Sequence, residues 1–197
     1  MPGYNLERMQ KQVLIKLQEL DPAHTYHSLE HTIGVIAQST RIARDEGISG
    51  RETFLLSIAA IYHDTGFLRG YANHEMLSCE IFLEDAIHFD ITDAEKQLVC
   101  DLILATKVPQ MPTTLLQEII CDADLDYLGR ADFATISNNL KLEFLNFGIV
   151  ADIASWEKLQ IKFLSNHQYH TKSSQRLREP AKKIHIAGLS KCSSVQI

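Results

Sequence analysis

The chain has 197 residues, of which 45% are hydrophobic and 22% are charged, and its formal net charge at neutral pH is −6. This length is enough for one domain with a full core, and the composition excludes a fibrous or intrinsically disordered protein. The acidic balance argues against binding to DNA or RNA polymers, which usually requires a basic surface. It still permits a small phosphate-containing ligand, because a bound metal ion supplies local positive charge.

The sequence predicts neither a secretory signal nor a membrane-spanning segment. The N-terminal residues lack the apolar stretch of a signal peptide, and no apolar run reaches the roughly 18 residues that a membrane helix needs. The four cysteines are scattered without a C-x-x-C pair, at Cys79, Cys100, Cys121 and Cys192. This pattern is typical of buried thiols in a reducing compartment, and we expect a cytoplasmic protein.

Apolar residues recur at helical spacing along nearly the whole chain. The predicted helices cover residues 5–20, 28–47, 52–62, 74–88, 92–108, 115–127, 131–150, 156–163 and 173–189. Ser28 is the predicted N-cap of the second helix, and Thr92 with Glu95 forms a capping box at the start of the fifth. Residues 65–73 are predicted to form a loop, and Pro180 to kink or divide the last helix. No run of alternating β-branched residues is bounded by hairpin turns, so we expect an all-α, single-domain protein over residues 1–197.

Polar side chains in three of these helices have the chemistry of metal ligands. His63 and Asp64 close the apolar third helix, where a carboxylate is costly unless it is paired or binds a metal. His31 lies four residues after His27, which places both side chains on one helix face. A later helix supplies the aspartates of Cys121-Asp122-Ala-Asp124. Imidazole and carboxylate groups together bind divalent ions such as Zn, Mn or Fe.

The order H … HD … D with these flanking residues resembles the HD-domain superfamily of metal-dependent phosphohydrolases. The resemblance covers about residues 26–130, and it implies a helical bundle with a metal bound between helices, onto which the helices of residues 131–190 pack. It implies four metal ligands, which are His31, His63, Asp64 and Asp124. The choice of Asp124 follows from the Ala-Asp-Leu triplet, whose aspartate is the ligand in this superfamily.

The stretch from Tyr26 to His31 also resembles the start of the corresponding helix in cyclic-nucleotide phosphodiesterases. In those enzymes the first histidine of this stretch protonates the leaving oxygen, so the resemblance makes His27 a candidate general acid. The chain departs from that pattern at one position, because Ser28 stands where those enzymes have asparagine.

Further residues are candidates around this site. Asp122 can orient a ligand or supply a proton from outside the ligand set, although a capping role explains such a carboxylate equally well. His74 resembles the first of the extra histidines that bind a second metal in some members, but no histidine stands near Thr106, where the second is expected. We therefore favour one ion of Mn, Mg, Fe, Co, Ni or Zn, with His74 free to contact the substrate phosphate or a weakly held second ion. Arg69 and Lys107 are candidate phosphate contacts by charge and position, and a solvated surface cation is the alternative for both.

The resemblance implies a phosphohydrolase or phosphodiesterase that cleaves a small phosphate ester, for which we expect a nucleotide. A homodimer is compatible with the sequence. Two alternatives are a non-catalytic module that binds metal and nucleotide, and a di-iron oxygenase, which needs the fuller set of metal ligands. The polar stretch that holds His167, Tyr169 and His170 lies between two predicted helices, where it can form a substrate wall or be simply exposed.

Overall fold

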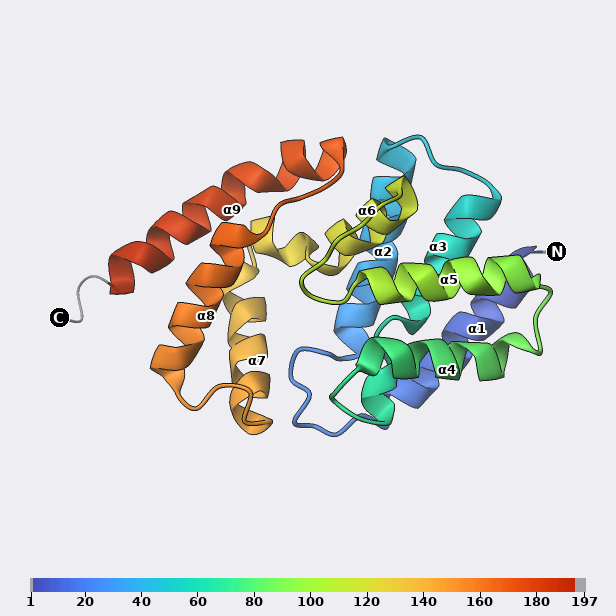
Figure 1. The fold of residues 1–197 in the computed structure, drawn as a ribbon, viewed down its shortest axis with the longest axis horizontal. Coiled ribbons are helices and arrows are strands. Elements are labelled where there is room, and N and C mark those ends of the chain that lie inside the picture. The colour runs from blue at the N-terminus through green and yellow to red at the C-terminus, as the bar shows by residue number, and fades with distance from the viewer. Residues whose placement is uncertain (1, 194–197) are drawn as a thin grey trace.

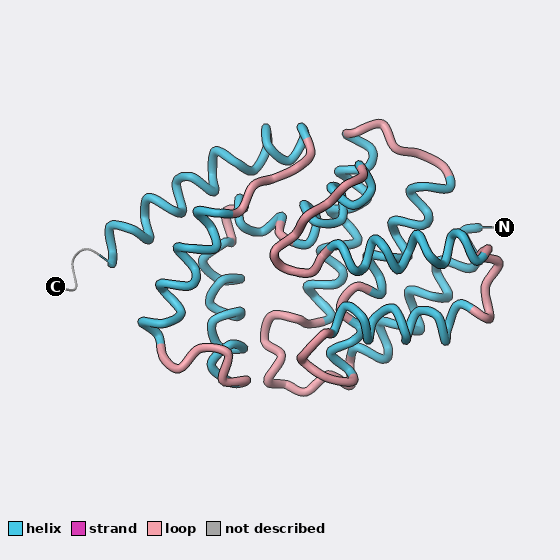
Figure 2. Tube along the Cα trace, in the orientation of Figure 1, coloured by secondary structure: helices cyan, strands magenta, loops and turns pink. Residues whose placement is uncertain are grey.

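The computed structural model describes residues 2–193 and, within them, the side chains of residues 6–191. In this part of the chain every regular element is helical, which confirms the predicted all-α class (Figure 2). The α-helices are α1 (Pro2–Leu17), α2 (Leu29–Asp45), α3 (Arg51–Tyr62), α4 (His74–Ala86), α5 (Asp93–Ala105), α6 (Leu115–Asp124), α7 (Phe133–Asn146), α8 (Ile153–Asn166) and α9 (Lys172–Ser193). Two 3₁₀ helices are η1 (Thr65–Leu68) and η2 (Asp126–Gly129). None of the described helices combines the length and the apolar character that a membrane span requires.

Two predicted caps fix where the helices near the site begin. The Ser28 Oγ accepts a hydrogen bond from the backbone N–H of His31, so His31 lies in the first turn of α2. Thr92 and Glu95 form the reciprocal capping box at the start of α5. Both caps satisfy backbone donors that a helix leaves unpaired at its N-terminus.

Some boundaries differ from the expected ones. The first helix begins at Pro2 and ends at Leu17. The helix that carries Asp124 ends at that residue, because the chain then tightens into η2 and buries Tyr127 in the second hydrophobic cluster. Pro180 lies within a continuous α9 and does not divide it. A proline removes one helical hydrogen bond, and α9 tolerates this loss.

Helices α1–α6 enclose the larger of two hydrophobic clusters. Helix α3 lies inside it, and every residue from Leu55 to Tyr62 is buried. A helix that is apolar on all its faces is one that neighbours surround, which explains the composition of this segment. His63 and Asp64 follow directly, so a rigid, packed helix holds them in place.

Helices α7–α9 lie together on one side of this first group (Figure 1). A second hydrophobic cluster joins them to it, through Tyr26, Leu125, Tyr127, Leu128, Phe133, Leu164 and Tyr169. The approach is close at Gly129, where a Cβ atom would lie 2.3 Å from the backbone oxygen of Arg178. The Arg178 guanidinium also donates to the carboxylate of Asp126 at 2.8 and 2.9 Å. These contacts support our proposal that residues 1–197 form one domain.

A partly buried histidine and a buried lysine hold α8 and α9 together. The Lys182 Nζ donates to the backbone oxygen of His167 at 2.6 Å and lies 3.2 Å from its Nδ1. Burial and the neighbouring Lys182 charge lower the pKa of His167 to about 3 from its ordinary value of 6.5. The imidazole is therefore neutral in the folded protein and accepts from the lysine through Nδ1.

This pair predicts a pH dependence of stability. Below pH 6.5 the unfolded chain takes up a proton on His167, whereas the folded chain does so only near pH 3. The stabilisation is thus fully present above pH 6.5 and declines as the pH falls, by roughly 2 kcal/mol at about pH 5. We expect His167→Asn, which keeps an acceptor near Nδ1, to remove about this much of the pH dependence of the unfolding free energy in urea. The same substitution at the exposed His88 is the control, and an unaltered dependence in His167→Asn would contradict the prediction.

Candidate metal centre

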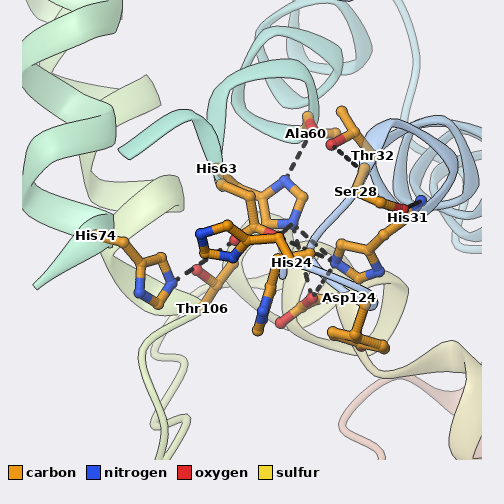
Figure 3. A network of polar contacts seen from close by, with 12 residues as sticks. His24, Ser28, His31, Thr32, Ala60, His63, His74, Thr106 and Asp124 are labelled. Atoms are coloured by element: carbon orange, nitrogen blue, oxygen red, sulfur yellow. Dashed lines mark hydrogen bonds and ion pairs between the residues drawn. The ribbon is translucent and has the colours of Figure 1, made fainter. Parts of the chain in front are cut away.

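Imidazole nitrogens and carboxylate oxygens from three helix ends meet at one point (Figure 3). The Nε2 of His31 lies 3.2 Å from the Nε2 of His63, 3.3 Å from Asp64 Oδ2 and 3.2 Å from Asp124 Oδ1. The Nε2 of His63 lies 3.1 Å from Asp64 Oδ2 and 3.7 Å from Asp124 Oδ1. The structure thus brings together the four residues predicted as metal ligands, and we call them the ligand cluster.

The ligand cluster fits a divalent metal ion. Asp64 Oδ2 is buried and makes no hydrogen bond, which is costly unless a cation lies beside it. The His63 Nδ1 bonds to the backbone oxygen of Ala60 at 3.0 Å, so Nδ1 carries the proton and Nε2 presents its lone pair to the centre. Two imidazoles and two carboxylates suit several first-row ions and leave positions open for water and substrate.

The electrostatics of the cluster also favour a cation. Burial alone would lower the pKa of His31, but the close carboxylates of Asp124 and Asp64 outweigh it and raise that pKa to about 10. Burial alone would raise the pKa of Asp64, yet the neighbouring His63 and His31 hold it well below its ordinary value. The Asp64 carboxylate is therefore ionised, and a bound metal would take the place of the proton on His31.

His74, the first residue of α4, lies beside the cluster. Its Nε2 is 3.7 Å from Asp64 Oδ1, and its ring stacks on Phe67 with 4.0 Å between centroids. This approach requires Gly66, because a Cβ atom there would lie 1.9 Å from the backbone oxygen of His74. Where a further histidine is expected for a second metal, Thr106 donates its hydroxyl to the backbone oxygen of Ile103.

The contact at Gly66 predicts a large effect of a small substitution. Gly66→Ala forces η1 and the start of α4 apart, and we expect it to lower the unfolding free energy by about 1–3 kcal/mol. Urea denaturation measures this loss, and metal content of the folded variant reports whether the cluster is disturbed. Gly188→Ala in α9 is the matched control, because a Cβ there meets nothing within 4 Å. Equal stability of the two variants would contradict the proposed role of Gly66.

His27 bonds to a buried carboxylate that sequence reasoning missed. Glu143 of α7 is fully buried, and its Oε1 bonds to the His27 Nδ1. Its Oε2 accepts from the backbone N–H groups of Tyr26 and His27 at 2.8 and 3.0 Å, and Oε1 also accepts from the Tyr71 hydroxyl at 3.2 Å. Burial would raise the pKa of Glu143, but His27 lowers it below its ordinary value. One signal was present in the sequence, because Glu143 stands between two apolar residues, Leu142 and Phe144.

Asp64 and Asp124 of the ligand cluster line one cavity of about 420 Å³ together with His27. Lys107 and His74 line it as well. Arg69 does not, because its guanidinium donates to Glu84 at 2.6 Å and to Glu80 at 3.4 Å on the surface of α4.

Asp122 and the polar stretch before α9 are placed next to one another. The Asp122 carboxylate accepts from the backbone N–H groups of His170 and Thr171 at 2.8 Å each, and from the Thr171 hydroxyl at 2.7 Å. The structure therefore does not bring Asp122 to the ligand cluster. Tyr169 is buried, whereas His167 and His170 line a neighbouring hollow of about 660 Å³.

Comparisons with known proteins agree with this geometry. A family model described as HD domain matches residues 28–126. The crystal structure of a predicted HD superfamily hydrolase from an uncultured Thermotogales bacterium is similar over 95% of this chain and 91% of that chain, with a TM-score of 0.59 and 19% identity. At this identity the likeness concerns the fold. A comparison with curated proteins found no significant match. Because the family model spans half of the chain and includes the whole ligand cluster, the chain belongs to the HD domain family.

Proposed function

We propose that the chain is a metal-dependent phosphohydrolase that cleaves a small phosphate ester with water. One observation carries the proposal: Asp64 and Asp124 of the ligand cluster line the same cavity as His27, whose ring bonds to Glu143. A metal centre alone would fit a binding module equally well. A positioned proton donor beside it is the second component that ester hydrolysis needs.

The ligand cluster would hold the metal through the four atoms that already converge. A divalent ion bound there supplies Lewis acidity, which lowers the pKa of water and polarises a phosphoryl oxygen. The bond from His63 to Ala60 fixes the ring so that Nε2 ligates. Lys107 lines the cavity and can neutralise a phosphate oxygen.

His27 is placed to protonate the leaving oxygen. Glu143 bonds to Nδ1, so it fixes the orientation of the ring. The Nε2 atom is then the one that can donate into the cavity. Tyr71 bonds to the same carboxylate and helps to hold it in place.

A panel of phosphate esters tests the proposal. The purified protein is assayed with Mn, Mg, Co, Ni, Zn and Fe against p-nitrophenyl phosphate, bis(p-nitrophenyl) phosphate, glycerol phosphate and nucleotides. We expect metal-dependent release of the alcohol or phenol. Tight nucleotide binding without turnover would instead identify a non-catalytic module. An iron content near two per chain, with oxygen consumption, would identify a di-iron oxygenase.

A further inference from the structure

We infer that the substrate carries a single phosphate ester of an apolar alcohol or phenol, whose carbon skeleton lies against α7 and α8. The inference rests on the proposed function, and it names the class of substrate that binds in the cavity lined by Asp64, Asp124 and His27. The cavity has a polar end at the ligand cluster and an apolar end between the two helices. Each end limits what can bind.

The apolar end is built from large hydrocarbon side chains. Those that α7 and α8 contribute include Phe133, Leu140, Phe144, Trp156, Leu159 and Phe163. Phe144 and Trp156 meet edge to face with 5.6 Å between centroids, which gives this wall a fixed shape. Apolar pockets of this size commonly bind a ligand of matching hydrophobic surface.

Hydrogen-bonding groups are scarce at this end. Among the described residues of α7 and α8 that line the cavity, Gln160 is the one polar side chain, and its amide already donates to the Ser137 hydroxyl. A nucleobase carries several donors and acceptors along its edge. Burying them without partners costs about 1–3 kcal/mol each, which disfavours a base in this position.

The charges at the polar end suit one phosphoryl group. Among the described residues lining the cavity, Lys107 is the one lysine or arginine, whereas Asp64, Glu75 and Asp124 are acidic. A metal ion, Lys107 and His27 can together neutralise a single phosphate. The further negative charges of a diphosphate or triphosphate would lack partners and would face the carboxylate of Glu75.

The position of His27 makes the apolar group the leaving group. Water attacks phosphorus and forms a new P–O bond. The P–O bond to the alcohol then breaks, and its electron pair stays on the alcohol oxygen. That oxygen takes the proton from His27, and the proton lost by the attacking water restores His27. The products are inorganic phosphate and an apolar alcohol.

Kinetic selectivity tests the substrate class. We expect kcat/KM for 1-naphthyl phosphate to exceed that for glycerol phosphate and for AMP by about tenfold or more.

The variant Leu159→Asn makes a partly exposed residue of the cavity polar. It should lower the preference for 1-naphthyl phosphate over glycerol phosphate, measured as the ratio of their kcat/KM values, by about tenfold. Leu142→Asn is the matched control, because Leu142 is similarly exposed on α7 and does not line the cavity. Equal or better turnover of AMP or glycerol phosphate would overturn the inference.

Binding without turnover separates this inference from the proposed function. Trp156 is the single tryptophan of the chain and lines the cavity, so its fluorescence reports occupancy. Benzylphosphonate, whose P–C bond cannot be hydrolysed, should quench this fluorescence in the metal-loaded protein, and Leu159→Asn should weaken the effect. Quenching in a protein that hydrolyses no ester would refute the phosphohydrolase and uphold the apolar site. Turnover of esters without any quenching would refute the apolar site and uphold the phosphohydrolase.

Discussion

His63→Ala is expected to lose both the bound metal and the hydrolytic activity. The His63 Nε2 lies within 3.7 Å of donor atoms from His31, Asp64 and Asp124. Removing it leaves the carboxylates of Asp64 and Asp124 with one fewer partner, and the remaining donors can no longer enclose an ion. We expect metal content to fall to about a tenth or less, and kcat/KM to fall about a thousandfold or more.

Elemental analysis of the dialysed variant measures the first effect, and the ester assay measures the second. His88→Ala, at an exposed position on the same chain, is the control for general effects of replacing a histidine. Retention of stoichiometric metal by a folded His63→Ala protein would contradict the proposal that the ligand cluster binds the metal.

Glu143→Gln is expected to slow the chemical step while leaving the metal in place. The amide preserves size and an acceptor oxygen for the backbone N–H groups of Tyr26 and His27, but it removes the negative charge beside the His27 ring. General acid catalysis contributes about 10²–10⁴-fold to such reactions, so we expect kcat to fall by a factor in this range for esters of poorly acidic alcohols.

The dependence on the leaving group identifies the role of Glu143. p-Nitrophenol leaves readily without a proton, so the same variant should lose much less activity with p-nitrophenyl phosphate. An equal loss with both kinds of ester would indicate that Glu143 is only structural. Glu84→Gln is the control, because that carboxylate pairs with Arg69 at the surface.

The ligand cluster was predictable because its signals are local. Each ligand lies at a helix start or end that caps or apolar runs mark, as Ser28 does for His31 and the buried run of α3 does for His63. Asp122 and Asp124 stand two residues apart on α6. Each residue of a helix is rotated by about 100° from the one before, so these two side chains point in nearly opposite directions. One of them can therefore face the cluster while the other faces the start of α9.

The remaining features depend on tertiary packing that no local pattern encodes. Glu143 stands 116 residues after His27, and only the docking of α7 brings them together. Arg69 was a reasonable phosphate contact by charge and loop position. The 3₁₀ turn of η1 instead directs it to Glu80 and Glu84, which lie one turn apart on α4.

Glu143 and the apolar wall of the cavity share one property: both lie beyond residue 126, where the match to the HD domain ends. In the proposed enzyme, the segment that would hold the metal and the segment that would select the substrate are therefore separate stretches of one chain. Changes in α7 and α8 can alter which alcohol is released while the metal chemistry stays intact. A new specificity in this scaffold then requires substitutions in two helices and none among the metal ligands.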